Sequence, residues 1–146
     1  MLTPSDLERL RGDYAHCFAC GRENPLGLGL DGFRAEDGEV VVGWVPRPEY
    51  AGFAGILHGG VVATALDEIC AWSAMLTEGV LVLTATLELR YRAQAPVDAS
   101  YRLAGRVDER RGRRLRISGS LQLDGAEVAA ASGVYLVHAS LGPAAG

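Results

Sequence analysis

The sequence contains no lysine, only three cysteines, and no apolar run long enough to cross a bilayer without a charged residue. Three cysteines cannot form a fully paired disulfide framework, and the opening MLTPSDLERL lacks the basic start and apolar core of a signal peptide. We therefore expect a cytoplasmic protein with reduced thiols. The longest mostly apolar stretch, 59–76, contains Asp67 and Glu68. Because buried charge is costly in lipid, we expect no membrane span and no membrane partner.

The composition is that of a globular protein, with 49% hydrophobic and 22% charged residues among 146. It excludes a disordered, collagen-like or disulfide-rich chain. The length predicts a single domain over residues 1–146. Within this domain we expect an N-terminal helix and loop over 1–27 and a flexible tail over 140–146.

The net charge of −4 is unevenly distributed. Residues 90–116 hold nine arginines against three acids, which gives +6, whereas the remainder holds five arginines against fifteen acids, which gives −10. A cationic strip on an acidic protein favours a local polyanionic ligand. Most of these arginines are equally well explained as a solvated sheet face. Only Tyr91 and Tyr101 supply aromatic rings within the strip, so we expect no nucleic-acid partner.

Two helices are predicted. Thr3 is a typical N-cap, with Pro4 at the first helical position and Asp6 three residues after the cap, so a short helix should end near Gly12. The segment 61–76 has no proline or glycine and is apolar nearly all round. This pattern predicts a long helix that is buried on most sides.

Six strands are predicted from turn residues and from alternation of apolar and polar side chains. They cover about 28–35, 40–45, 83–92, 101–107, 115–123 and 127–138. One helix cannot cover six antiparallel strands and be enclosed itself unless the sheet curls round it. We therefore expect an α+β fold in which a curved antiparallel sheet wraps one long central helix. Its exposed edges predict a homo-oligomer.

The most informative segment is GILHGGVVATALDE, which ends at Glu68. Gly59 and Gly60 at a helix start would expose backbone N–H groups at the positive end of the helix dipole, where a developing oxyanion is stabilised. Asp67 follows about two turns later in the same helix. A carboxylate removed from water has a raised pKa, as a general base acting near neutrality requires.

Each of these features also has a purely structural interpretation. His58 could cap the helix, the two glycines could form a tight turn, and Asp67 and Glu68 could pair with arginines of the sheet. Their combination in one glycine-rich helix start favours a functional site.

The segment GILHGGVVATALDE resembles the HGG-to-Asp signature of hotdog-fold acyl-CoA thioesterases, specifically the PaaI-like branch. HCFACGRENPLGLGL is similar to the C-x-x-C-G-x-x-N-P-x-G-L opening of such proteins, and LTATLELRYRAQAPV is similar to the strand after their helix. Together the three segments cover most of residues 17–97 in matching order. The resemblance implies the hotdog fold, and it implies that the N-terminal loop is a structural lid.

The resemblance also implies roles for single residues. Asp67 matches the acid that activates the hydrolytic water, and Gly59 with its neighbour Gly60 matches the amides that polarise the thioester carbonyl. His58 matches the histidine that shapes the loop, and Thr84 matches a hydroxyl that supports the water. In this family the site is assembled across a dimer.

One departure concerns the loop before the histidine. Many relatives carry Asn or Gln where this chain has Gly52 or Ala51, so no side-chain amide is available to the substrate here. Glu68 beside Asp67 leaves open which acid is used, but adjacent helix residues point about 100° apart, so only one of them can face the site.

Coenzyme A gives the arginine strip a candidate partner, because arginine is well suited to phosphate recognition. The candidate contacts are Arg90 and Arg92 at the end of one strand and Arg113 and Arg114 at a hairpin tip. No cofactor is expected beyond the coenzyme A of the substrate itself.

The cysteines raise the question of zinc. Cys17 and Cys20 form half of a structural zinc site, and completing it would need His16 together with the distant Cys70 or His138. We therefore expect no metal and two reduced thiols.

These observations predict an acyl-CoA thioesterase that forms a homodimer or homotetramer and releases the free acid and CoA. Two alternatives remain open. One is an acyl-CoA or acyl-carrier binding module without catalysis, and the other is a hotdog hydratase or dehydratase with a histidine base. The sequence leaves the acyl group undetermined, whether aryl, short or long.

Overall fold

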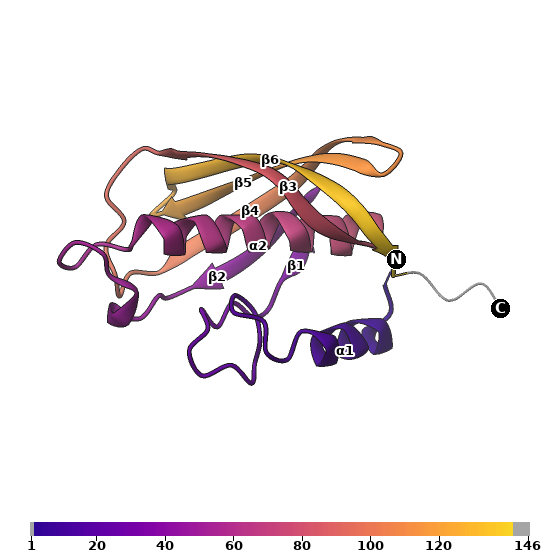
Figure 1. Cartoon of the computed structure of the whole chain (residues 1–146). Coiled ribbons are helices and arrows are strands. Elements are labelled where there is room, and N and C mark those ends of the chain that lie inside the picture. Colours follow the sequence, from indigo (N-terminus) through magenta and orange to yellow (C-terminus); the bar gives the residue numbers. More distant parts are fainter. Residues whose placement is uncertain (1, 142–146) are drawn as a thin grey trace.

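Six antiparallel strands form one curved sheet in the order β1-β2-β4-β5-β6-β3, with the long helix α2 against its inner face (Figure 1). The computed structural model describes residues 2–141. In chain order the elements are α1 (Pro4–Asp13), β1 (Arg34–Glu36), β2 (Glu39–Trp44), the 3-10 turn η1 (Pro48–Tyr50), α2 (Gly59–Glu78), β3 (Val80–Tyr91), β4 (Tyr101–Arg111), β5 (Arg114–Leu123) and β6 (Ala126–Ser140). The predicted α+β fold, with about six strands around one helix, is confirmed.

α2 packs against the sheet along its length. It contacts β2 to β6, and its apolar residues join those of the sheet in a common core. The helix ends at Gly79, which adopts the left-handed conformation (φ 64°) that glycine tolerates at a C-cap. By length and composition it is apolar enough to cross a membrane, but half of the tested window is buried inside the protein. We interpret it as the core helix.

The N-terminal segment covers the side of α2 that faces away from the sheet (Figure 1). α1 begins as predicted, with Thr3 and Asp6 forming a reciprocal capping box. The strand predicted over 28–35 is wrong except at its end, since β1 starts only at Arg34. Leu28 and Leu30 donate their backbone N–H groups to carbonyls of the preceding loop instead. Their apolar side chains are therefore buried under a loop, not in the sheet.

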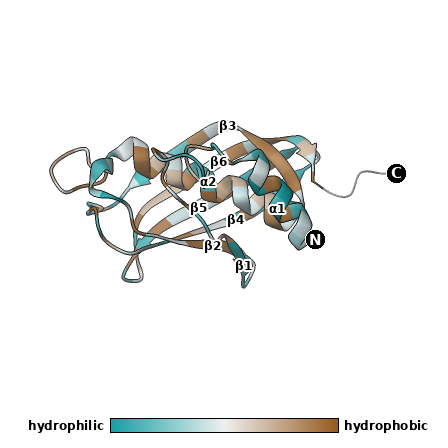
Figure 2. Cartoon of the chain, turned by 90° about the horizontal axis from the view of Figure 1, so that it is seen from below, coloured by the Kyte–Doolittle hydropathy of each residue, from teal (hydrophilic) through white to brown (hydrophobic). Residues whose placement is uncertain are grey.

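β3 breaks the simple alternation predicted for it. A bulge between Thr84 and Thr86 shifts its register against β6. As a result Leu83 is 59% exposed, whereas Leu87 and Leu89 pack against the core. Figure 2 shows the same strand with a hydrophobic first half and a more polar second half. The bulge is what lets Thr84 and Leu87, an odd number of residues apart, both face α2.

The chain end differs slightly from the predicted tail over 140–146. β6 continues through Ser140, and Leu141 donates its N–H to Gly79 O at 2.8 Å. The rest of the predicted tail, 142–146, lies outside the described residues.

Candidate active site

Asp67 lies in the middle of α2 and faces the two last strands of the sheet. Its Oδ1 accepts hydrogen bonds from the Thr84 hydroxyl of β3 at 2.8 Å and the Tyr135 hydroxyl of β6 at 2.9 Å. Among the described residues, none hydrogen-bonds to Oδ2. The carboxylate is thus fixed through one oxygen, and the other oxygen is available to a water molecule.

Tyr135 is the functional candidate that the sequence analysis missed. Its side chain is fully buried, and burial raises its pKa, so the phenol remains a donor at any physiological pH. The segment 127–138 is apolar on both faces, so its pattern did not single out a tyrosine whose hydroxyl contacts α2. The only available signal was a tyrosine on a central strand, which needs a hydrogen-bond partner when it is buried.

The start of α2 is formed by the HGG segment. His58 is the N-cap, and its Nδ1 accepts the N–H of Gly60 at 2.9 Å. Val61 and Val62 donate to the His58 carbonyl, and the Tyr91 hydroxyl donates to the Gly59 carbonyl at 2.7 Å. Within the part of the chain that the structure describes, the N–H of Gly59 has no acceptor. Of the two glycine amides predicted as an oxyanion hole, only that of Gly59 is free.

Gly59 and Asp67 of one chain are too far apart to act on the same carbonyl. They are eight residues apart in one helix, which corresponds to about 12 Å along its axis. A reacting atom must lie about 3 Å from both the attacking group and the oxyanion donor. One copy of the chain therefore does not bring the two groups to a common reacting atom.

Glu68 faces a different part of the molecule from Asp67. Its Oε1 accepts the Trp72 indole N–H at 3.2 Å and lies 3.8 Å from Cys17 Sγ in the N-terminal loop. Burial raises the pKa of this carboxyl group. The structure thus places Asp67 with Thr84 and Tyr135, and it places Glu68 under the loop.

The loop before the histidine packs closely on it. Gly52 donates to Ile56 O at 2.9 Å, and a Cβ at Gly52 would lie 3.1 Å from the Cα of His58. Ala51 forms an isolated bridge with Leu57. Both positions adjoin the helix start as predicted, and neither brings a polar side chain to it.

A model of the thioesterase superfamily matches residues 54–130, more than half of the chain. The chain belongs to the thioesterase superfamily. The hotdog fold and the resemblance to its thioesterases are thereby confirmed.

Solved structures show the same fold. One thioesterase superfamily protein is 29% identical, with a TM-score of 0.74, over 84% of this chain and 60% of its own, so the chain spans less than two thirds of that protein. A phenylacetic acid degradation-related protein from Ralstonia eutropha JMP134 is 27% identical, with a TM-score of 0.66, over 75% of this chain and 86% of its own. A protein from Streptococcus mutans UA159, solved bound to acetyl-CoA, shares the fold at 20% identity (TM-score 0.68, 75% of this chain and 91% of its own).

In this superfamily member the candidate arginines lie at two ends of the molecule. Arg90 and Arg92 end β3 near the start of α2, and Arg92 pairs with Glu127 at 2.7 Å. Arg113 and Arg114 lie at the β4–β5 turn, beyond the C-terminal end of α2, and Arg113 donates to Val137 O at 2.8 Å. Within one copy, only the first pair is near Gly59.

A groove of about 390 Å³ lies beside the start of α2. Its lining is mostly apolar and includes Leu57, Val62, Tyr91, Arg92 and Val128. One of its lining side chains, Tyr91, donates to the Gly59 carbonyl, so the groove lies next to the helix start.

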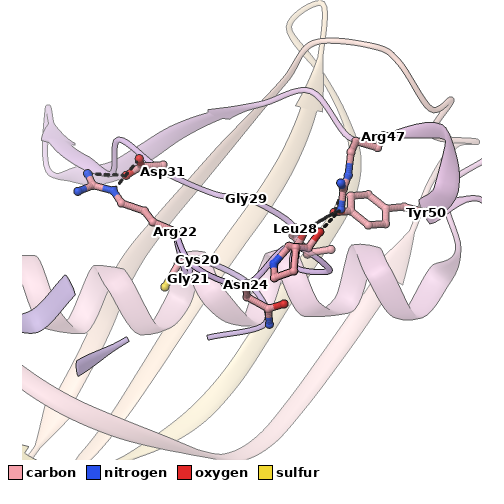
Figure 3. A pocket seen from close by; sticks show the side chains of 11 residues that line it. Cys20, Gly21, Arg22, Asn24, Leu28, Gly29, Asp31, Arg47 and Tyr50 are labelled. Atoms are coloured by element: carbon pink, nitrogen blue, oxygen red, sulfur yellow. Dashed lines mark hydrogen bonds and ion pairs between the residues drawn. The ribbon is translucent and has the colours of Figure 1, made fainter. Parts of the chain in front are cut away.

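A second pocket of about 440 Å³ is structural (Figure 3). On one side Arg22 pairs with Asp31 at 3.0 Å. On the other side Arg47 donates to the Tyr50 hydroxyl at 2.6 Å, and that hydroxyl donates to Gly27 O. Both guanidinium groups already have acceptors, so this pocket fastens the N-terminal loop to η1.

Of the zinc ligands considered from the sequence, the structure groups Cys17 with Cys20 but does not add His16 or Cys70 to them. His16 is exposed and lies 3.8 Å from Glu23. Cys70 is buried on the sheet side of α2, where its Sγ would lie 3.2 Å from a Cβ at Gly119. Among the described residues, the group of possible ligand atoms around Cys17 and Cys20 includes neither of them.

Proposed function

We propose that the protein hydrolyses an acyl-CoA thioester to the free acid and CoA, with Asp67 as general base. The observation that carries this proposal is the carboxylate of Asp67, held through Oδ1 by Thr84 and Tyr135 while Oδ2 has no hydrogen-bond partner among the described residues. Two solved relatives add support for the ligand: the Streptococcus mutans protein bound to acetyl-CoA, and a hypothetical thioesterase from Streptococcus pneumoniae TIGR4 solved with coenzyme A.

The proposed reaction begins with a water hydrogen-bonded to Oδ2 of Asp67. The carboxylate takes one water proton while the water oxygen forms a bond to the thioester carbon. Negative charge develops on the carbonyl oxygen. This oxygen accepts a hydrogen bond from the free N–H of Gly59, at the positive end of the α2 dipole. The C–S bond then breaks, and the proton on Asp67 passes to the departing CoA sulfur.

The site requires a second copy, and β3 is the strand that can bring it. β3 ends the sheet, so one of its edges has no strand partner within the described chain. Asp67 contacts β3 at Thr84, and Gly59 contacts β3 at Tyr91. If two β3 strands pair antiparallel about a two-fold axis midway between Thr84 and Tyr91, Asp67 of one copy lies next to Gly59 of the other. That midpoint lies at Leu87 and Glu88. We therefore propose a homodimer with two sites, each shared between copies.

The CoA phosphates are proposed to lie at Arg90 and Arg92, with the pantetheine arm in the groove next to the start of α2. Arg113 and Arg114 remain candidates only for the second copy, because they lie at the opposite end of their own helix. Any tetramer would form from such dimers.

The hydratase alternative is disfavoured by the state of His58. Its Nδ1 lone pair accepts the Gly60 N–H, so the neutral ring carries its proton on Nε2. Neither nitrogen then has a free lone pair with which to remove a substrate proton. The binding-module alternative remains, since Gly52 and Ala51 supply no side-chain amide to the substrate.

The test is thiol release from aromatic, short and long acyl-CoAs by the wild type and by Asp67→Asn. We expect the substitution to lower kcat at least a hundredfold without unfolding the protein. Asp124→Asn is the matched control, because Asp124 lies in an exposed turn at φ 51°, which asparagine tolerates. Collapse of activity in Glu68→Gln but not in Asp67→Asn would overturn the assignment of the base. Saturable CoA binding without turnover in the wild type would establish the binding module instead.

A further inference from the structure

Two cysteines of the N-terminal loop and one carboxylate of α2 converge outside the proposed active site. Cys17 Sγ, Cys20 Sγ and one carboxylate oxygen of Glu68 all lie within 4.8 Å of one another. Cys17 Sγ is 3.8 Å from Glu68 Oε1. The residues are about fifty positions apart in the sequence, so only folding brings the third group to the pair.

The spacing of these atoms suits a tetrahedral cation. Zinc binds thiolate sulfur at about 2.3 Å and carboxylate oxygen at about 2.0–2.2 Å, which places neighbouring ligand atoms about 3.5–3.8 Å apart. Cys17 and Glu68 already have that separation. Cys20 Sγ lies within 4.8 Å of the other two ligand atoms, so a contraction of about 1 Å completes the set.

The loop is shaped to hold both sulfurs on one side. The backbone N–H of Cys20 points at Cys17 Sγ, with an N···S distance of 3.5 Å. Gly21 follows at a point where a Cβ would lie 2.6 Å from both Ala15 O and Cys17 O. The turn is therefore so tight that only glycine fits after the second cysteine. The Cys20 N–H points at Cys17 Sγ, the atom that would carry negative charge as a metal-bound thiolate.

The cluster contains three acidic groups and lacks a balancing cation. Cys20 is buried, Cys17 and Glu68 are half-buried, and no ion pair in residues 2–141 includes Glu68. Trp72 donates its indole N–H to Glu68 Oε1 at 3.2 Å and so orients the carboxylate, as outer-shell donors do at metal sites. The cluster thus offers three protein ligands without a positively charged side chain paired to them, and a divalent cation would supply that charge.

We infer that Cys17, Cys20 and Glu68 bind one zinc-class divalent cation, with a water as the fourth ligand. Two thiolates select a borderline-soft ion over magnesium or calcium. Binding displaces the thiol protons to solvent, forms two metal–sulfur bonds and one metal–oxygen bond, and changes no oxidation state. The ion would clamp the N-terminal loop onto α2. This inference replaces the expectation of no metal and is independent of the proposed hydrolysis.

The test measures metal in protein produced from zinc-supplemented medium without a polyhistidine tag. We expect about one zinc per chain by elemental mass spectrometry and, after replacement by Co²⁺, the intense visible and near-ultraviolet bands of a tetrahedral thiolate site. Cys17→Ser and Cys20→Ser should each lose both signals, and Glu68→Gln should bind more weakly. Cys70→Ala is the matched control and should keep one metal per chain.

A second readout needs no variant. In the wild type, zinc should protect Cys17, the more exposed of the two thiols, from alkylation, and it should raise the Tm. Asp67→Asn should still bind the ion, which separates this proposal from the failure of the proposed reaction. Folded wild type that stays metal-free after zinc exposure, with no cobalt bands and unprotected thiols, would overturn the inference. So would cobalt bands that persist in both serine variants.

Discussion

The Tyr135 hydroxyl donates to Asp67 Oδ1 at 2.9 Å, from a fully buried position on a strand 68 residues later in the chain. Thr84 donates to the same oxygen from the neighbouring strand β3. Because the carboxylate is held from two strands, its direction depends on how β3 and β6 are paired. The bulge after Thr84 is part of this arrangement, since it sets which residues of β3 face α2.

Tyr135→Phe should lower kcat by about 10- to 100-fold and leave KM nearly unchanged. A hydrogen bond to a charged group contributes about 1.5–3 kcal/mol, and each 1.4 kcal/mol corresponds to tenfold in rate. Tyr135 orients the carboxylate and does not touch the substrate in this proposal. Steady-state kinetics on the acyl-CoA found by the panel would measure the split.

Thr84→Val is the partner variant for Tyr135→Phe. Both side chains donate to Oδ1 of Asp67, so their effects are not independent. The fold-loss of activity in the double variant should therefore be smaller than the product of the two single fold-losses. A loss confined to KM in either variant would mean that the hydroxyl contacts substrate directly.

His58→Ala should destabilise the protein by about 1 kcal/mol, because alanine cannot accept the Gly60 N–H at the N-cap of α2. For a chain of this size the corresponding fall in Tm is about 3 °C. His58→Asn, which restores a capping oxygen, should recover most of the stability. Calorimetry of the three proteins checks this, and equal Tm values for His58→Ala and wild type would contradict the capping role.

Gly105→Ala should destabilise the protein by about 1–3 kcal/mol through overpacking. A Cβ at Gly105 would overlap Ser73 Oγ and lie 2.9 Å from Ile69 O, both on α2. Gly43→Ala on β2 is the control, because a Cβ there meets nothing within 4 Å. Urea unfolding should show a lower midpoint for the first variant only, and a similar loss in both would mean that backbone entropy decides the result.

Glu88→Cys should form a disulfide-linked dimer under mild oxidation. The proposed two-fold axis passes at Leu87 or Glu88, and with the axis at Glu88 the Cα atoms of the two Glu88 residues would lie about 4.5–5.5 Å apart. Glu39→Cys on β2, which lies away from β3 in the sheet, should form no disulfide-linked dimer under the same treatment. Non-reducing electrophoresis distinguishes them, and crosslinking of both variants to the same extent would remove support for the β3 interface.

Local sequence rules predicted those elements whose signals are local. The Thr3 cap and the long apolar helix after HGG appear where expected. Each depends on residues within four positions of one another, so neighbouring side chains and backbone geometry decide them. The same holds for His58 as N-cap, one of the structural interpretations open from the sequence.

Non-local features were predicted less well. Residues 28–33 have the apolar pattern of a strand, but their backbone pairs with the loop near Phe18 and Ala19. Leu83 has the spacing of a core residue, but the bulge turns it outward. In both cases the apolar pattern indicates that a side chain can be buried. Which segment it packs against depends on parts of the chain that are distant in sequence.

The sequence alone determined the family resemblance and the helix that carries Asp67. Tertiary structure alone decided that Tyr135 and Thr84 hold the same carboxylate oxygen. It also decided that Glu68 joins Cys17 and Cys20 under the loop. The physical reason is that hydrogen bonds and metal ligands require atoms within about 4 Å, and no pattern along one chain fixes which distant residues fold to that distance.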